Sequence, residues 1–193
     1  SVPVTSTTPG TYQVSATLGG AAVQGSPASV TFVAGPADAT TSTISASVTE
    51  LVVDNASQSE ITVQLRDSLG HPLTTSGGTV AIATSEGTVG PTTDNGDGTY
   101  SAILTAPSEV SVATVSFTLD AVVGARTTTV TFVPGTASPA RSTIVAADPT
   151  LVADGAATTQ VTVTLLDGFD NFLTASGGDV VVATSAGTVT ATT

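Results

Sequence analysis

Few side chains in this sequence could perform acid–base or nucleophilic chemistry. His71 is the only histidine, and the chain has no cysteine and no lysine. A histidine could act as a general base or bind a metal ion, but His71 lies in a turn sequence, and Asn171 takes its place in a second copy of that sequence. No nucleophile or orienting partner accompanies it, as a catalytic histidine requires. We expect an exposed turn residue, and we assign no catalytic, cofactor-binding or metal-binding residue.

Two acidic turns resemble calcium loops in composition. One contains Asp94 and Asp97, and the other contains Asp167, Asp170 and Asn171. Calcium takes roughly six to eight oxygen ligands, often from closely spaced Asp and Asn, but neither turn has the full EF-hand spacing. Asn-Gly and Asp-Gly are also the residues that tight hairpins require. We favour hairpin turns and no cofactor, with calcium at Asp94/Asp97 or Asp167/Asp170 as the alternative.

An exposed pair of aromatic rings could stack on a sugar or a base. Phe169 and Phe172 are the only candidate pair, because the chain has five Phe, two Tyr and no Trp. Their counterparts in the other copy of this turn are Leu69 and Pro72. The pair is thus a local variation, and we favour burial of both rings under a neighbouring unit or in a terminal contact.

The charge balance excludes several partners. Fifteen acidic residues against three arginines give a net charge of −12. A nucleic-acid binder needs a basic face, and an anionic membrane surface attracts basic segments. No apolar run is long enough to cross a bilayer. We therefore expect neither a nucleic-acid partner nor membrane insertion.

An internal repeat determines which elements position these residues. Residues 42–93 and 142–193 align without a gap at an offset of 100, with 26 of 52 positions identical. Residues 31–35 and 131–135 match at the same offset. Ser1 therefore corresponds to Ser101, and the chain is just under two periods long.

Linkers containing Gly and Pro, at 35–39 and 135–139, divide the chain. They contain one acid, Asp38, so we expect some bending between units rather than junctions fixed by calcium. The two terminal parts together lack only the counterpart of residues 94–100. We predict three parts: the C-terminal part of an immunoglobulin-like repeat at 1–35, a complete repeat at 36–135, and the N-terminal part of a further repeat at 136–193.

Each unit shows the period of two that is typical of half-buried antiparallel strands, as in 61–65 and 161–165. Several short strands in about 100 residues, with frequent turns, indicate an immunoglobulin-like sandwich. The predicted fold is all-β, with tandem sandwiches at a period of about 100 residues. The expected core of the complete unit is apolar and comprises Ile44, Leu51, Ile61, Val63, Leu65, Val80, Ile82, Ile103, Leu104, Val115, Phe117, Leu119, Val130 and Phe132.

Three motifs carry a family likeness. They are the segment PADATTSTI at 36–44, the strand and turn ITVQLRDSLGHPL at 61–73, and TSEGTV at 84–89 followed by TDNGDGTY at 93–100. Together they resemble the bacterial immunoglobulin-like repeats of invasin- and intimin-type surface adhesins. His71 stands where that family usually has Asn. The resemblance implies an extracellular antiparallel sandwich, stacked in tandem on the bacterial cell surface as a stalk whose repeats are mostly spacers.

Three functions fit these observations. The first, which we favour, is a non-catalytic stalk segment of a cell-surface adhesin or fibre whose partners are neighbouring repeats. The second is a filament subunit in which the unit at 142–193 of one chain accepts the strands at 1–35 of the next by strand donation. The third is a sugar- or receptor-binding module that uses Phe169 or Phe172, which the fold alone does not exclude.

Overall fold

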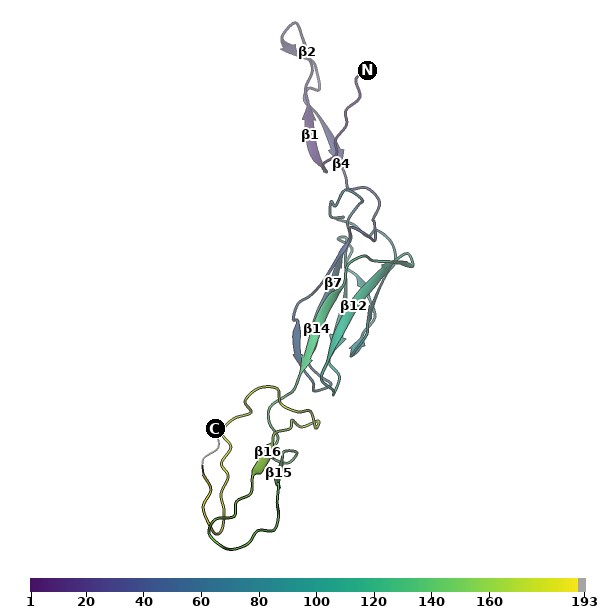
Figure 1. The fold of residues 1–193 in the computed structure, drawn as a ribbon. Helices are drawn as coiled ribbons and strands as arrows, with labels where there is room; N and C mark the ends of the chain where they lie inside the picture. The colour runs from purple at the N-terminus through teal and green to yellow at the C-terminus, as the bar shows by residue number, and fades with distance from the viewer. Residues whose placement is uncertain (191–193) are drawn as a thin grey trace.

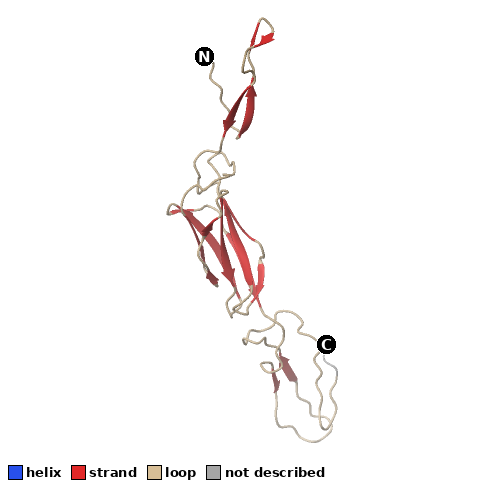
Figure 2. Ribbon diagram, turned by 180° about the vertical axis from the view of Figure 1, so that it is seen from behind, coloured by secondary structure: helices blue, strands red, loops and turns tan. Residues whose placement is uncertain are grey.

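The computed structural model describes residues 1–190 of the chain. The molecule is elongated, and three successive parts follow one another along its length (Figures 1 and 2). Its regular secondary structure over these residues consists of β-strands, which confirms the predicted all-β class. No helix in this described range is long and apolar enough to cross a membrane.

The middle part is a sandwich of two sheets. The first sheet has the order β10-β11-β7-β5, with β9 also pairing with β11. Its strands are β5 (Thr43–Ala46), β7 (Gln58–Gln64), β9 (Thr88–Val89), β10 (Thr93–Asp94) and β11 (Thr99–Thr105). The second sheet has the order β13-β12-β14-β6, with β8 also pairing with β12. Its strands are β6 (Glu50–Val52), β8 (Val80–Thr84), β12 (Ser111–Leu119), β13 (Val122–Val123) and β14 (Thr128–Val133).

All strand pairs are antiparallel except β14 with β6, which run parallel. The core lies between the two sheets because alternate residues of each strand point inward. Along β12, Ala113, Val115, Phe117 and Leu119 are buried, and the residues between them are more exposed. The central strands therefore follow the predicted period of two.

The predicted core is confirmed except at Ile103, which is 42% exposed. Its neighbour Leu104 is fully buried, and successive residues of a strand face opposite sides. Val53 and Tyr100 are also buried, although they were not among the predicted core residues. The Tyr100 hydroxyl donates a hydrogen bond of 2.7 Å to the carbonyl of Gly78, so its polar end is satisfied inside the fold.

The first part of the chain forms a β-hairpin. Strand β1 (Gly10–Val14) pairs with β4 (Ala28–Phe32), and the short strands β2 (Thr17–Leu18) and β3 (Ala21–Ala22) extend it. The tip at Gly19 and Gly20 has positive φ angles of 56° and 87°. Asp120 and Ala121, between β12 and β13, also have positive φ angles, of 48° and 67°. The hairpin of the first part therefore has the design of the β12–β14 hairpin.

Strand pairing corrects the expectation that Ser1 corresponds to Ser101 throughout this segment. Tyr12 pairs with Val30, whereas Ala113 pairs with Val130. The sequence offset is thus 100 at Val30 but 101 at Tyr12, because the connection between the strands is one residue longer in the first part. With this correction, Tyr12 occupies the inward position of Ala113.

The third part contains two described strands, β15 (Thr143–Ala146) and β16 (Val161–Thr164), which pair with each other. Residues 150–152 and 180–184 correspond to β6 and β8 but are not strands. In the middle sandwich, β6 pairs with β14 and β8 pairs with β12. Without such neighbours the same pattern cannot form a ladder.

Candidate functional site: the junctions between repeats

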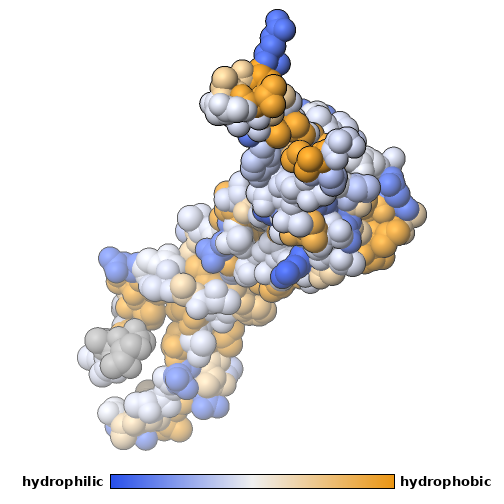
Figure 3. Space-filling view, turned by 90° about the horizontal axis from the view of Figure 1, so that it is seen from above, coloured by the Kyte–Doolittle hydropathy of each residue, from blue (hydrophilic) through white to orange (hydrophobic). Residues whose placement is uncertain are grey.

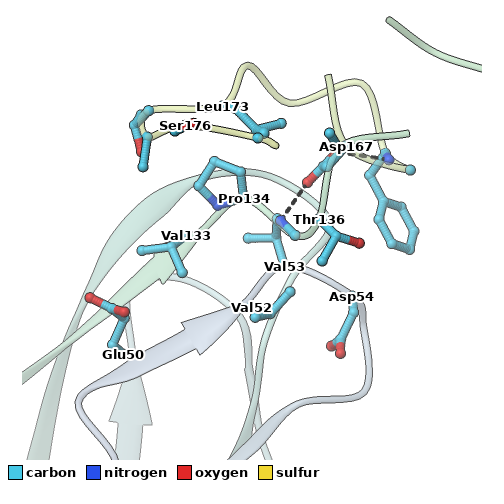
Figure 4. A pocket seen from close by; sticks show the side chains of 17 residues that line it. Glu50, Val52, Val53, Asp54, Val133, Pro134, Thr136, Asp167, Leu173 and Ser176 are labelled. Carbon is cyan, nitrogen blue, oxygen red and sulfur yellow. Dashed lines mark hydrogen bonds between the residues drawn. The ribbon is translucent and has the colours of Figure 1, made fainter. Parts of the chain in front are cut away.

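A buried aspartate joins the third part to the end of the sandwich. Asp167 is 1% exposed. Its Oδ2 accepts a hydrogen bond of 3.0 Å from the backbone N–H of Gly135, the second residue after the last strand of the sandwich. Its Oδ1 accepts the N–H of Phe169 at 2.8 Å (Figure 4). The same oxygen accepts the N–H of Asn171 at 3.0 Å. One carboxylate therefore closes its own turn and binds the preceding repeat.

The same arrangement occurs one repeat earlier. Asp67 Oδ2 accepts the N–H of Gly35 at 2.9 Å. Its Oδ1 accepts the N–H groups of Leu69 at 3.0 Å and His71 at 2.9 Å. These three backbone-to-carboxylate bonds match those of Asp167 at the offset of 100. We call this arrangement the aspartate anchor: Asp67 with Gly35, and Asp167 with Gly135.

One serine contact, repeated in both units, supports the anchor loop. The N–H of Arg66 donates to Ser42 Oγ at 3.0 Å, and the N–H of Leu166 donates to Ser142 Oγ at 3.1 Å. These bonds tie the start of each unit to the residue that precedes its aspartate.

The anchor stabilises the ionised carboxylates. The N–H of Gly35 contributes most to lowering the pKa of Asp67 to about 2, and hydrogen bonds from His71 and Leu69 add to the effect. Burial is the largest influence on the pKa of Asp167 and raises it, but hydrogen bonds from Gly135, Asn171 and Phe169 together outweigh burial and lower it. Both carboxylates are therefore negatively charged at neutral pH.

His71 is not the free turn residue that the sequence suggested. Its side chain is 25% exposed, and its Nδ1 lies 3.1 Å from Asp67 Oδ2. That carboxylate also accepts three backbone N–H groups. The histidine therefore completes the anchor instead of standing alone in an exposed turn.

Asn171, at the position that corresponds to His71, forms hydrogen bonds with the preceding sandwich. Its Nδ2 donates to the carbonyl of Ser108 at 2.8 Å, and its Oδ1 accepts the N–H of Val110 at 3.3 Å. Ser108 and Val110 lie just before β12 in the middle sandwich. We call the junction between the middle sandwich and the third part the lower junction, and the one between the first part and the sandwich the upper junction. The lower junction therefore has two hydrogen bonds between domains in addition to the anchor.

Beside the lower anchor is an open cavity of about 840 Å³. Val52 and Pro134 line it from the sandwich, and Leu173 lines it from the third part (Figure 4). The expectation that Phe169 and Phe172 are buried is wrong. Phe169 is 45% exposed at the cavity wall, and Phe172 is 69% exposed, because the third part places little over this turn.

The acidic turns suggested as calcium loops use their carboxylates locally. Asp94 Oδ1 accepts the N–H of Gly96 at 2.9 Å, and Asp97 Oδ1 accepts the N–H of Thr99 at 2.9 Å. Asp170 forms an ion pair of 3.0 Å with Arg141, whereas its turn neighbour Asp167 forms the anchor. Over residues 1–190, no three His, Cys, Asp or Glu side chains gather in a metal-binding cluster.

The anchor was not predicted from the sequence. Asp167 was expected in a calcium-like turn, and Asp67 only in a turn. The available signal was the identity of Gly35 with Gly135 and of Asp67 with Asp167 at one offset. That signal shows repetition, but it does not show that the glycine N–H meets the carboxylate.

Comparisons with known proteins agree with this architecture. The family model described as "Invasin, domain 3" matches residues 38–135 and again residues 138–193. The crystal structure of invasin, described as a bacterial integrin-binding protein, is 31% identical with a TM-score of 0.64 and covers 88% of this chain. FdeC, an Escherichia coli adhesin, is 26% identical with a TM-score of 0.60 and covers 87%. InvD of Yersinia pseudotuberculosis is 29% identical with a TM-score of 0.58 and covers 70%.

The chain spans 34% of the invasin structure, 54% of the FdeC structure and 40% of the InvD structure. These likenesses confirm the predicted immunoglobulin-like sandwich and the predicted resemblance to adhesin repeats. Two consecutive matches to one family model cover most of the sequence. The chain therefore belongs to the invasin domain 3 family of immunoglobulin-like adhesin domains.

Proposed function

We propose that this chain is a stalk segment that holds the binding part of a bacterial adhesin away from the cell surface, outside the cell. Its role is mechanical and not catalytic, and its partners are the repeats on either side. The observation that carries the proposal is the aspartate anchor, which recurs at both junctions with the same donor and acceptor, a glycine N–H and an aspartate Oδ2.

A stalk must keep the orientation of each repeat fixed relative to the next. A linker alone lets neighbouring domains reorient freely. The anchor limits that freedom because a carboxylate inside one unit accepts the last backbone N–H of the unit before it. Bonds to a charged acceptor are stronger than neutral ones, and the carboxylates are largely shielded from water.

The relatives support the same role. FdeC is described as an adhesin, and invasin as a protein that binds integrin. The chain corresponds to a part of each, and a repeated unit inside a larger adhesin is suited to spacing. We further propose that hydrogen bonds, and not bound calcium, hold these junctions.

The stiffness of the lower junction can be measured by pulsed electron spin resonance. The chain has no cysteine, so spin labels can be attached specifically to Val123→Cys and Val145→Cys, two exposed positions on either side of the junction. We expect a narrow distance distribution that broadens when Asp167→Ala is added. Dilution with unlabelled chain removes distances between molecules.

Asp97→Ala is the matched control, because it removes an aspartate from a turn of the sandwich and leaves the anchor intact. It should keep the narrow distribution. A distribution that is already broad in the parent, or unchanged by Asp167→Ala, would overturn the stalk proposal. Saturable binding to a glycan or host receptor that Phe169→Ala abolishes would assign a binding module instead.

A further inference from the structure

One exposed turn of the middle sandwich brings reactive groups together. Strongly hydrophilic residues stand in separate groups over the surface (Figure 3). The turn at 95–98, which joins the paired strands β10 and β11, is a polar loop that takes no part in either anchor. It contains Asn95 and Gly96, the only Asn-Gly pair in the sequence. Both residues are exposed, so water reaches them.

An Asn-Gly pair has the groups for a reaction within its own backbone. The glycine nitrogen attacks Cγ, the side-chain carbonyl carbon of the asparagine, and a five-membered succinimide ring forms. Glycine permits this because it has no Cβ to obstruct the ring and because its backbone adopts many conformations. Gly96 has a φ angle of 81°, and a Cβ built on it meets nothing within 4 Å, so its surroundings leave it room to move.

The carboxylate of Asp94 lies beside the attacking nitrogen. Its Oδ1 accepts the N–H of Gly96 at 2.9 Å. The nitrogen must lose this proton to become a nucleophile, so a carboxylate in this position is placed to act as the base. Hydrogen bonds from the Ser76 side chain, the larger effect, and from the Gly96 N–H lower the pKa of Asp94. The carboxylate is therefore ionised at neutral pH and accepts protons there.

Two side chains of β11 hold the carboxamide of Asn95. Its Nδ2 donates to Thr99 Oγ1 at 3.0 Å, and its Oδ1 accepts the hydroxyl of Ser101 at 3.4 Å. Negative charge develops on Oδ1 when the nitrogen attacks Cγ, and a hydroxyl donor directed at that oxygen stabilises the charge. The contact with Ser101 is long in the resting structure, and such contacts tighten as the charge develops.

We propose that Asn95 is a site of self-modification, at which the chain converts this asparagine to aspartate or isoaspartate. Asp94 takes the proton of the Gly96 nitrogen while that nitrogen bonds to Cγ of Asn95. The bond between Cγ and Nδ2 then breaks, and Nδ2 takes up the proton and leaves as ammonia. One water molecule opens the succinimide at either of its two carbonyl carbons. The whole reaction consumes one water and releases one ammonia.

The other two asparagines lack part of this arrangement. Asn55 has the same carboxylate contact, because the N–H of Ala56 donates to Asp54 Oδ1 at 2.8 Å. The residue that follows it is alanine, however, and the Cβ of alanine obstructs the ring. The side chain of Asn171 is bonded to the carbonyl of Ser108, and a phenylalanine follows it. We therefore expect the reaction at Asn95 alone.

The modification changes both the charge and the length of the turn. Aspartate at this position adds a third carboxylate beside Asp94 and Asp97, and isoaspartate also adds a methylene to the main chain. The turn supports the sandwich, because the carbonyl of Gly98 accepts the N–H of Leu65 at 2.9 Å and Gln64 Nε2 at 3.1 Å. The modified chain should therefore unfold at a lower urea concentration than the fresh chain, and equal midpoints contradict this consequence.

Peptide mapping of the 193-residue chain tests the proposal. Trypsin cleaves after the arginines at 66, 126 and 141, so Asn55, Asn95 and Asn171 fall in the separate peptides 1–66, 67–126 and 142–193. During incubation at neutral pH, peptide 67–126 alone should gain the mass difference between OH and NH2. It should also separate into two chromatographic peaks, aspartate and isoaspartate. A fresh sample digested in parallel corrects for change during digestion.

The proposal is overturned if peptide 67–126 gains no mass, or if peptide 1–66 gains mass equally fast. Gly96→Ala, which introduces the obstructing Cβ, should slow the gain at least about tenfold, equivalent to about 1.4 kcal/mol in the barrier. Each variant changes an exposed residue, so a cooperative urea transition shows that it is folded. A rate that Gly96→Ala leaves unchanged excludes attack by the glycine nitrogen.

The role of Asp94 has its own matched control. Asp94→Ala should slow the gain by about tenfold or more, because the base is lost. Asp97→Ala removes an equal charge from the same turn, but its carboxylate bonds to Thr99 and not to Gly96, so it should not slow the reaction. Equal slowing by both variants, or none by Asp94→Ala, shows that Asp94 is not the base. This inference does not depend on the proposed stalk role, and neither experiment decides the other.

Discussion

The backbone N–H of Gly135 donates a hydrogen bond of 3.0 Å to Oδ2 of Asp167, and Gly35 donates to Asp67 in the same way at 2.9 Å. This relationship links the last residue of one repeat to a turn inside the next. It makes the turn that follows β7 in the sandwich, and β16 in the third part, a component of the junction and not only a surface loop.

The hydrogen bond between Gly35 and Asp67 should be lost only in strong acid. The pKa of Asp67 is about 2, below the usual value of about 3.9. Since the folded state has the lower pKa, the anchor's stabilisation is complete above about pH 4 and is lost as the pH falls through about 2. The amide proton of Gly35, followed by NMR, should shift with a midpoint near pH 2. A midpoint near 4 contradicts the assignment.

Asn171 should protect one amide of the neighbouring domain. The N–H of Val110 donates to Asn171 Oδ1, and such a bond contributes about 1 kcal/mol net. We expect Asn171→Ala to speed hydrogen exchange at Val110 by about fivefold, measured by NMR. His71→Ala, the change at the corresponding position, should leave Val110 unaffected, and an equal effect from both variants would refute the interdomain bond.

Two glycines of one hairpin should differ in their tolerance of alanine. Gly96 and Gly98 have positive φ angles of 81° and 87°. A Cβ on Gly96 meets nothing within 4 Å, whereas one on Gly98 overlaps the backbone carbonyl of Leu73. Strain alone should cost Gly96→Ala about 1 kcal/mol.

Gly98→Ala adds the overlap to that strain and should cost at least about 2 kcal/mol more. Chemical denaturation of the two variants side by side measures the difference. Equal losses of stability would show that the loop at Leu73 moves away freely.

Truncation to alanine should destabilise the fold more at Phe132 than at Ile103. Phe132 is fully buried between the sheets, so Phe132→Ala should lower the free energy of unfolding by about 3–5 kcal/mol. Ile103→Ala removes a side chain that is 42% exposed and should cost about 1 kcal/mol or less. Urea unfolding monitored by circular dichroism tests both. A large loss at Ile103 would contradict its outward orientation.

The hydrophobic period and the repeat were sufficient to predict the sandwich and most of its core. Alternation along a strand is a local property, and a buried face requires it. The same rule fails where two apolar neighbours compete, as at Ile103 and Leu104, because only the neighbouring sheet decides which of them points inward.

The candidate site was less predictable. The sequence shows that Asp67 recurs as Asp167, but a carboxylate has many possible partners in a turn. Its contact with Gly35 or Gly135 joins residues 32 positions apart in the chain. The bond depends on how two units are placed against each other, and no local pattern records that placement.

The difference between what the sequence determines and what the tertiary structure decides is clearest at Leu51 and Leu151. The sequence by itself determined that both belong to a short apolar segment at the same place in a repeat. Only the tertiary structure decided that Leu51 is buried in β6 while Leu151 remains 43% exposed outside any strand. The physical reason is that a strand is stable only beside a partner that accepts its hydrogen bonds and covers its apolar side, and β14 supplies that partner to Leu51 alone.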